Sequence, residues 1–178
     1  KKKKKALSVY MHALGATGIT AYGGLLETGA LKDGEQVFIS TAAGAVGSVA
    51  AQIAKIKGCY VVGSTGADDK VAWLRDEVGL DAVINYKTQD LAQALKDATP
   101  KGIDVYFENV GGGHLDAALP RMNVRGRIPV CGMISSYNDT EAAPGPSNIS
   151  MILIRRARMQ GFIVFDHWQN FSRFLEEV

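Results

Sequence analysis

Cysteine, histidine and long apolar runs are all scarce in this sequence. Two cysteines, Cys59 and Cys131, and three histidines occur among 178 residues, and they lie far apart. A structural zinc site needs about four clustered ligands, so we expect no metal centre. Each cysteine lies in an apolar run, which indicates a buried, reduced thiol in a cytoplasmic protein. No run reaches the roughly 20 apolar residues of a membrane-spanning helix, so we expect no membrane partner.

A basic surface is also missing once the first residues are set aside. The net charge is +2, but five lysines, Lys1–Lys5, open the sequence, so the remainder carries net negative charge. This excludes a basic nucleic-acid-binding protein. No apolar segment typical of a signal peptide follows the lysines. We interpret residues 1–5 as a disordered or added tail rather than a membrane anchor.

The stretch from Gln36 onward has the order of a nucleotide-binding unit. Gln36–Ser40 is a short apolar run typical of a buried parallel strand. Gly44 and Gly47 follow, and apolar residues then recur at helical spacing as far as Gly58, where a left-handed helix cap is expected. A second strand is predicted at residues 59–62. Strand, glycine turn, helix and strand form the first unit of a dinucleotide-binding fold.

The glycine turn has the chemistry of a pyrophosphate site. A helix N-terminus offers unpaired N–H groups and a partial positive charge to an anion. Gly44 removes a side chain where a phosphate would come close, and Gly47 lets the helix pack closely. Ala42 replaces the first glycine of the usual pattern, and a tight turn without a ligand is the alternative interpretation. The candidate cofactor contacts here are Gly44, Ala45, Val46 and Gly47.

Strands and helices alternate through the rest of the chain. Alternation of this kind predicts an α/β fold, a doubly wound, six-stranded parallel sheet of the Rossmann type. The predicted strands are residues 36–40, 59–62, 82–84, 103–107, 127–134 and 159–165, and the predicted helices are residues 19–29, 45–57, 68–79, 91–98, 115–122, 151–156 and 168–178, with a further helix possible within 6–14. Pro129 conflicts with a central strand because proline donates no ladder hydrogen bond.

The chain divides into three predicted parts. Residues 1–5 are the tail, residues 6–34 a helical connector, and residues 35–178 the dinucleotide-binding domain, which stops in the middle of a helical pattern. Residues 135–150 form a loop long enough to suggest a functional role.

The residues after the second strand favour NADP over NAD. An acid about 20 residues beyond the glycine turn binds the ribose hydroxyls in NAD-specific folds, and counting from Gly44 reaches Ser64 instead. No carboxylate stands there to repel a 2′-phosphate. Lys70 lies in the first turn of the next predicted helix, where it could make a charge-assisted phosphate contact. The alternative for Lys70 is an ordinary solvated lysine.

Several motifs in order resemble one enzyme family. LGATGITAYGGLLETG, AAGAVGSVAAQIAKIKGC, ENVGG, RIPVCGMISSYN and QGFIVFD follow one another along the chain. Together they resemble the zinc-independent branch of the medium-chain dehydrogenases/reductases, which holds prostaglandin, alkenal and curcumin reductases. The resemblance implies NADPH-dependent reduction of the carbon–carbon double bond of small enone or enal substrates. The family's Met-Pro-Gly is replaced here by Ala16-Thr17-Gly18, and its substrate-binding domain has no counterpart in the sequence.

The same resemblance implies most of the remaining site residues. Lys70 and Tyr86 match the 2′-phosphate ligands. Further cofactor contacts match at Asn109, at Cys131, Gly132, Met133, Ile134, Ser135, Ser136 and Tyr137, and at Phe162, Ile163 and Val164. For residues 162–164 plain core packing is the alternative, and Asn109 could be an ordinary turn residue. Family members often pair, so a homodimer is an expectation, with residues 149–154 as the candidate contact.

Tyr137 is the candidate catalytic residue. Hydride addition to an enone places negative charge on the carbonyl oxygen, and without a metal that charge must be stabilised by hydrogen-bond donors. A family tyrosine at the matching position implies that Tyr137 donates to the enolate, directly or through a cofactor hydroxyl. The alternative is a loop tyrosine that only packs on the cofactor.

Other chemistries have little support in the sequence. No tyrosine has a lysine four residues later, and neither a G-x-S-x-G elbow nor a G-x-x-x-x-G-K-[ST] loop occurs. A non-catalytic NADPH-binding sensor or structural module is the main alternative function. A methyltransferase is more distant, because its methyl donor has no phosphate for Lys70 to bind.

Overall fold

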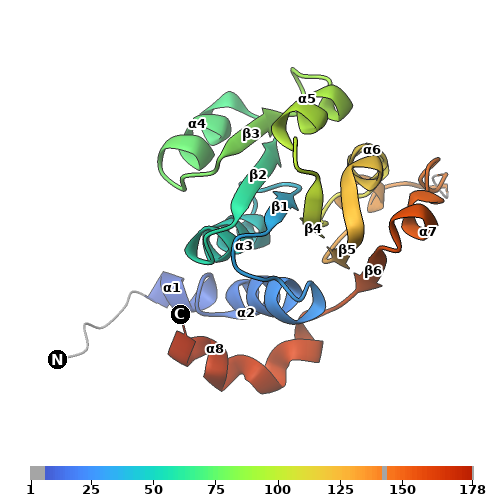
Figure 1. Cartoon of the computed structure of the whole chain (residues 1–178). Coiled ribbons are helices and arrows are strands. Elements are labelled where there is room, and N and C mark those ends of the chain that lie inside the picture. The colour runs from blue at the N-terminus through green and yellow to red at the C-terminus, as the bar shows by residue number, and fades with distance from the viewer. Residues whose placement is uncertain (1–6, 142–143, 178) are drawn as a thin grey trace.

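A six-stranded parallel sheet forms the centre of the protein. The computed structural model describes residues 7–141 and 144–177, so the Lys1–Lys5 tail lies outside the described residues. The strand order is β3-β2-β1-β4-β5-β6, which is the predicted doubly wound arrangement (Figure 1). The strands are β1 (Gln36–Ile39), β2 (Tyr60–Thr65), β3 (Ala82–Asn85), β4 (Ile103–Phe107), β5 (Met122–Val130) and β6 (Arg158–Gly161).

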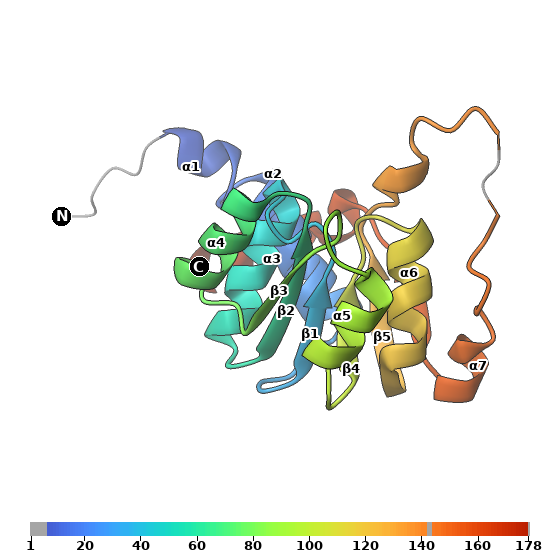
Figure 2. The same ribbon diagram turned by 90° about the horizontal axis from the view of Figure 1, so that it is seen from above.

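Helices cover both faces of this sheet. The α-helices are α1 (Leu7–Met11), α2 (Ala16–Tyr22), α3 (Ala45–Ile56), α4 (Asp68–Asp76), α5 (Leu91–Ala98), α6 (Gly112–Ala118), α7 (Met151–Arg155) and α8 (Phe171–Glu177). A π-helix, Gly23–Thr28, continues α2. One apolar core joins α2, α3, α4 and α8 to one face of the sheet, and a second joins α5, α6 and α7 to the other (Figure 2). No described helix is long and apolar enough to cross a membrane.

Of the six strands only β4 has the predicted bounds, and β5 and β6 differ most from the prediction. β5 begins at Met122, five residues before the predicted start, and the register against β4 shifts between Ile103 and Val105. Sequence patterning does not predict this part of the strand, because polar Asn123 and small Gly126 lie at a bulge, where apolar and polar residues do not alternate regularly. Pro129 does lie inside β5, where its carbonyl accepts from the Glu108 N–H at 3.0 Å. Having no N–H, it leaves the ladder one hydrogen bond short.

The sixth strand is also shorter than predicted. β6 ends at Gly161, and a 3₁₀-helix, Val164–Asn170, takes up the end of the predicted strand and the start of the predicted helix. Phe162 turns inward and its ring packs against those of Phe107 and His167. The helix predicted at residues 115–122 likewise begins earlier and ends earlier, as α6. A 3₁₀ turn containing Pro120 follows it, as expected for a residue that breaks helices.

The α2 region packs against the last two helical segments, Val164–Asn170 and α8, on one face of the sheet. Three glycines of the α2 region allow this contact: a Cβ on Gly18, Gly23 or Gly24 would come within 2.7, 2.2 and 2.3 Å of the rings of Phe174, His167 and Phe162. The Glu27 carboxylate accepts from Nδ2 of Asn170, at 2.7 Å, and from Arg173, at 2.9 Å, and lies 3.0 Å from Nδ1 of His167. We call this contact, between residues 18–27 and residues 162–174, the terminal clasp.

Candidate functional site

The N-terminus of α3 is open toward the carboxyl edge of the sheet. Gly44 is its N-cap residue, and no described side chain caps the first N–H groups. A Cβ on Gly47 would lie 2.2 Å from the Thr41 carbonyl oxygen, so only glycine permits this close approach between helix and turn. The exposed N–H groups and the dipole of this 12-residue helix make a suitable anion site.

A cavity of about 250 Å³ adjoins this helix end and carries positive charge. It is lined by Thr41, Ala43, Gly44, Thr65, Gly66, Ala67, Lys70, Tyr86 and Lys87, which include two lysines and no carboxylate among the described residues. Thus three predicted cofactor residues, Gly44, Lys70 and Tyr86, come together around one space. Sequence reasoning missed Lys87. Its only signal was its place next to Tyr86, just past the end of a strand.

Ser64 lies away from that cavity. Its side chain is fully buried, and its hydroxyl is 3.1 Å from Nε2 of His114 on the other face of the sheet. Its neighbour Thr65 lines the cavity instead. Consecutive strand residues face opposite sides of a sheet, and counting residues from the glycine turn cannot tell which of the two faces the ligand.

A second cavity, of about 390 Å³, continues along the same edge. It shares Thr41 and Tyr86 with the first, and its other walls are Leu91, Val110, Gly111, Gly113, His114, Ile134 and Ser135. The His114 ring meets the Tyr86 ring edge-on, with centroids 5.0 Å apart. Burial lowers the pKa of His114, against a smaller opposing effect of Glu108. This side chain is therefore held as neutral imidazole in the cavity wall.

A third cavity, of about 690 Å³, lies beneath the loop after β5. Ser135 lines both the second and the third cavities, so the three cavities follow one another along the carboxyl ends of the strands, and we call them together the cofactor groove. The wall of the third includes Met133, Ser136 and Asp139 on the loop side and Leu115 of α6. Figure 2 shows this loop leaving the carboxyl edge beside α6. Open parallel sheets bind ligands at this edge.

A buried carboxylate holds the turn after β4. Glu108 is fully buried and accepts three hydrogen bonds: from the Tyr106 hydroxyl at 2.6 Å, the Ser40 hydroxyl at 2.9 Å and the Val110 N–H at 2.6 Å. Burial first, and the nearby Glu108 second, raise the pKa of Tyr106 well above its ordinary value, so its phenol remains a donor. Sequence reasoning used Glu108 only as part of a motif and gave it no role.

Asn109 is tied into the same turn. Its Nδ2 donates to the Ser40 carbonyl at 2.7 Å, and its own carbonyl accepts from the Ile134 N–H at 3.1 Å. The next carbonyl, of Val110, accepts from the Ser135 N–H at 3.0 Å. The turn after β4 therefore supports the loop after β5. Asn109 has a positioning role in this structure whether or not it also contacts a cofactor.

Tyr137 folds back over the end of β5. The residue is 65% exposed, and its hydroxyl accepts from the Met133 N–H at 3.3 Å. A Cβ on Gly132 would come within 2.9 Å of that hydroxyl, so glycine makes room for it. No described residue accepts a hydrogen bond from the Tyr137 hydroxyl. The exposed side chain can therefore donate that proton to a ligand bound above the end of β5.

The remaining predicted contacts differ in exposure. Phe162 is a core residue with 8% exposure, which matches the core alternative for its side chain, whereas Ile163 is 61% exposed and Val164 is partly buried. Cys131 is partly buried at the end of β5, and burial raises the pKa of its thiol to about 11. Cys131 is thus a neutral thiol, not a nucleophile.

Comparison with known proteins places the chain in a family. The family described as zinc-binding dehydrogenase matches residues 45–178. The chain belongs to this family. No group of three or more His, Cys, Asp or Glu side chains that could hold a metal ion occurs in the part of the chain that the structure describes.

Individual relatives are reductases. The chain is 50% identical over 177 residues to the NADP(+)-dependent 2-alkenal reductase of Nicotiana tabacum, covering 99% of this chain and 51% of the relative. It is 50% identical over 165 residues to prostaglandin reductase 1 of Bos taurus, covering 92% and 49%. The crystal structure of CurA from Vibrio vulnificus in complex with NADPH superimposes with a TM-score of 0.91 at 41% identity, covering 99% and 54%. The chain therefore spans about half the length of the relatives it matches.

Proposed function

We propose that this chain is the NADPH-binding part of a reductase that acts on the carbon–carbon double bond of α,β-unsaturated ketones and aldehydes. The cavity at the N-terminus of α3, with Lys70 and Lys87 and without a carboxylate, is the observation that carries the proposal. The named activities of the alkenal and prostaglandin reductases and the NADPH in CurA support it.

The residues present fit NADPH. The uncapped first turn of α3 suits the pyrophosphate, and Lys70, Lys87 and Tyr86 suit the 2′-phosphate. Residues 131–137 would form the wall beside the nicotinamide. When bound, NADPH supplies the hydride.

Tyr137 is the proposed catalytic residue. As negative charge develops on the substrate carbonyl oxygen, the exposed phenol donates a hydrogen bond to it. The Met133 N–H bonded to the same hydroxyl strengthens it as a donor, because hydrogen bonds in a chain polarise one another. We propose that the activity is independent of zinc.

Two measurements test the proposed function. NADPH should bind this chain at least tenfold more tightly than NADH, measured by fluorescence titration, and equal affinities would contradict the assignment. The longest natural protein that contains this sequence should consume NADPH with an enone substrate. This chain spans about half the length of its relatives, so we predict that it turns the enone over poorly by itself, because positioning of the substrate contributes several kcal/mol. NADPH binding without turnover by the longer protein would favour the sensor or structural module.

We also propose that the chain pairs with a second copy. β6 is at the edge of the sheet, and Ile149, Leu153 and Ile154 beside it are 51, 80 and 54% exposed. Light scattering should therefore report a dimer that Leu153→Glu weakens. We further propose that the chain works in the cytoplasm. Its two free thiols, Cys59 and Cys131, support this location because thiols stay reduced in that compartment.

A further inference from the structure

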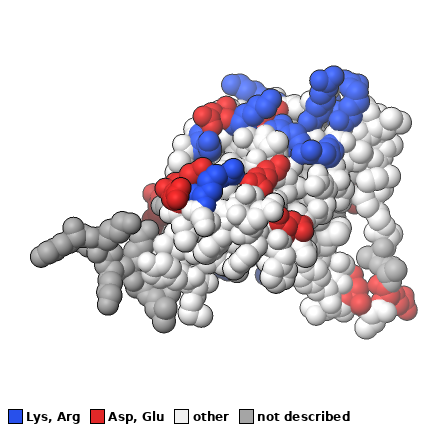
Figure 3. Space-filling model, turned by 90° about the horizontal axis from the view of Figure 1, so that it is seen from below, with Lys and Arg blue, Asp and Glu red and all other residues white. Residues whose placement is uncertain are grey.

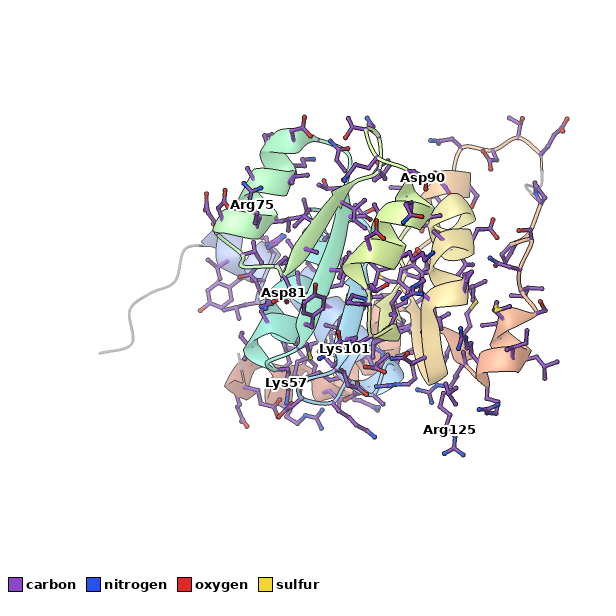
Figure 4. All side chains as sticks on the ribbon, turned by 45° about the horizontal axis from the view of Figure 1, so that its top comes forward. Lys57, Arg75, Asp81, Asp90, Lys101 and Arg125 are labelled. Carbon is purple, nitrogen blue, oxygen red and sulfur yellow. The ribbon has the colours of Figure 1, made fainter. Side chains whose placement is uncertain are left out.

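A positively charged hollow lies at the amino edge of the sheet, opposite the cofactor groove. It has a volume of about 520 Å³ and is lined by Ala30, Lys32, Glu35, Asp104, Val124, Arg125, Arg127, Arg156 and Arg158. Five cations thus face two carboxylates. Figure 3 shows the basic side chains gathered along one edge of the molecule, and Figure 4 shows Arg125 extending from it.

Most of this charge is not neutralised within the protein. The Arg127–Glu35 pair is the one ion pair of the hollow among the described residues. Arg127 also donates from Nε to the Gly29 carbonyl at 2.8 Å, which fixes it as the floor. Asp104 accepts from the Gln36 N–H at 2.9 Å and from Asn123, and not from an arginine. Arg158 donates to the Thr28 carbonyl at 2.5 Å but has no carboxylate partner among the described residues. Lys32, Arg125 and Arg156 therefore offer the most available charge for a ligand, and Arg158 adds to the positive potential.

The backbone around the hollow is strained. The described chain has four non-glycine residues with positive φ, and three of them line this one hollow: Ala30 (φ 45°), Arg125 (φ 63°) and Arg156 (φ 50°). The fourth, Thr41, lies in the cofactor groove. Left-handed backbone is unfavourable for a side chain such as arginine, and such strain gathers at binding sites. At these two positions, Arg125 and Arg156, the residue with left-handed backbone is an arginine that lines the hollow.

Helix ends explain only a part of this arrangement. Arg156 caps the C-terminus of α7, where glycine is the usual residue and where a cation is favourable. Arg125 and Arg158 belong to strands, however, and Lys32 lies in the irregular segment before β1. Their convergence with Arg156 on one hollow is not required by any helix.

We propose that this hollow is a second anion site, distinct from the cofactor groove, for a small molecule that carries two or more linked phosphate groups. Guanidinium groups match phosphate oxygens in pairs, and several cations around one space favour a ligand of high charge density. Arg125 and Arg156 bind from the rim, while Arg127 holds the floor.

The test uses inorganic pyrophosphate as the probe. Its binding to the whole 178-residue chain is followed by NMR, through the shifts of the backbone amide signals at constant ionic strength. The amides of Arg125, Gly126 and Arg156 should shift together with one dissociation constant. Shifts at Gly44–Gly47 report the cofactor groove, so failure of one site is distinguishable from failure of the other.

The decisive variant is R125N/R156N. Asparagine tolerates left-handed backbone better than arginine, so the unfolding midpoint should stay equal or rise while the affinity for pyrophosphate at this hollow falls tenfold or more. The matched control R75Q/K96Q removes two exposed cations elsewhere and should bind as wild type does. Wild-type amides that do not shift at millimolar pyrophosphate, or a double variant that binds unchanged, would overturn the proposal. The proposal would also be overturned if a hexa-aspartate peptide shifted these amide signals and pyrophosphate did not.

Discussion

The hydroxyl of Ser40 donates to the carboxylate of Glu108 at 2.9 Å and joins the ends of two neighbouring strands, β1 and β4. The same hydroxyl accepts from the Asn109 N–H at 2.8 Å. The carboxylate therefore organises the turn that forms the floor of the cofactor groove, and no ion pair among the described residues involves it.

Glu108→Gln should weaken both stability and cofactor binding. A glutamine has one acceptor oxygen and cannot accept from Ser40, Val110 and Tyr106 as the carboxylate does, so at least one buried donor loses its partner. We expect a loss of about 1–3 kcal/mol in the free energy of unfolding in urea and weaker NADPH binding. The control, Tyr106→Phe, removes one donor but keeps the Val110 contact. If both variants lower stability and neither changes NADPH affinity, Glu108 does not position the groove.

Lys70→Ala and Lys87→Ala should each weaken NADPH binding and leave NADH binding unchanged. Losing a charge-assisted phosphate contact costs about 1.5–3 kcal/mol, or roughly ten- to a hundred-fold in affinity. Fluorescence titration of both cofactors measures this, with the exposed Lys96→Ala as the control. An equal loss for NADPH and NADH would place these lysines outside the 2′-phosphate site.

Tyr137→Phe should lower kcat of the reductase that contains this sequence by at least tenfold, about 1.4 kcal/mol or more. The affinity for NADPH should stay the same, because the ring remains over the end of β5. Steady-state kinetics with an enone, together with NADPH titration, separates the two effects, and Tyr10→Phe is the control. Unchanged turnover would reduce Tyr137 to a packing residue.

Protonation of His114 should make stability pH-dependent. Because burial lowers the pKa of His114, the unfolded state binds the proton more readily, and the free energy of unfolding should fall as pH decreases below the ordinary histidine pKa of about 6.5. Denaturant unfolding between pH 7.5 and pH 5 measures the slope. His114→Gln, which keeps a hydrogen-bonding group near Ser64, should flatten it. A slope that is the same in the variant would assign the effect to other groups.

Local pattern explains which parts of the fold the sequence predicts. Leu91–Ala98 and Ile103–Phe107 have the predicted bounds because Asp90 caps the helix and the strand is apolar at four of its five residues. The start of β5 was missed because its bulge interrupts the alternation on which strand prediction depends. The end of β6 was missed because Phe162 is apolar through packing with Phe107 and His167, not through continuing the strand.

Contacts between distant segments explain what the sequence did not predict about the site. Gly44 and Lys70 were predicted from their places after strand ends, because parallel strands bring their carboxyl ends to one edge. Tyr86 was predicted from the resemblance to the reductase family. The bond between Ser40 and Glu108 depends on the pairing of β1 with β4 and joins residues 68 positions apart, and the contact between Ser64 and His114 joins residues 50 positions apart. No local pattern reports that pairing.

The terminal clasp has a consequence for the order of events during synthesis. The rings of Phe162, His167 and Phe174, which pack over Gly18, Gly23 and Gly24, are synthesised roughly 140 to 160 residues after these glycines. Contacts of such long sequence separation form slowly, and apolar surface that waits for a partner is prone to aggregate. The apolar surface of the α2 region thus stays uncovered in a nascent chain until α8 has been synthesised, and in that interval it is open to aggregation or to binding by a chaperone.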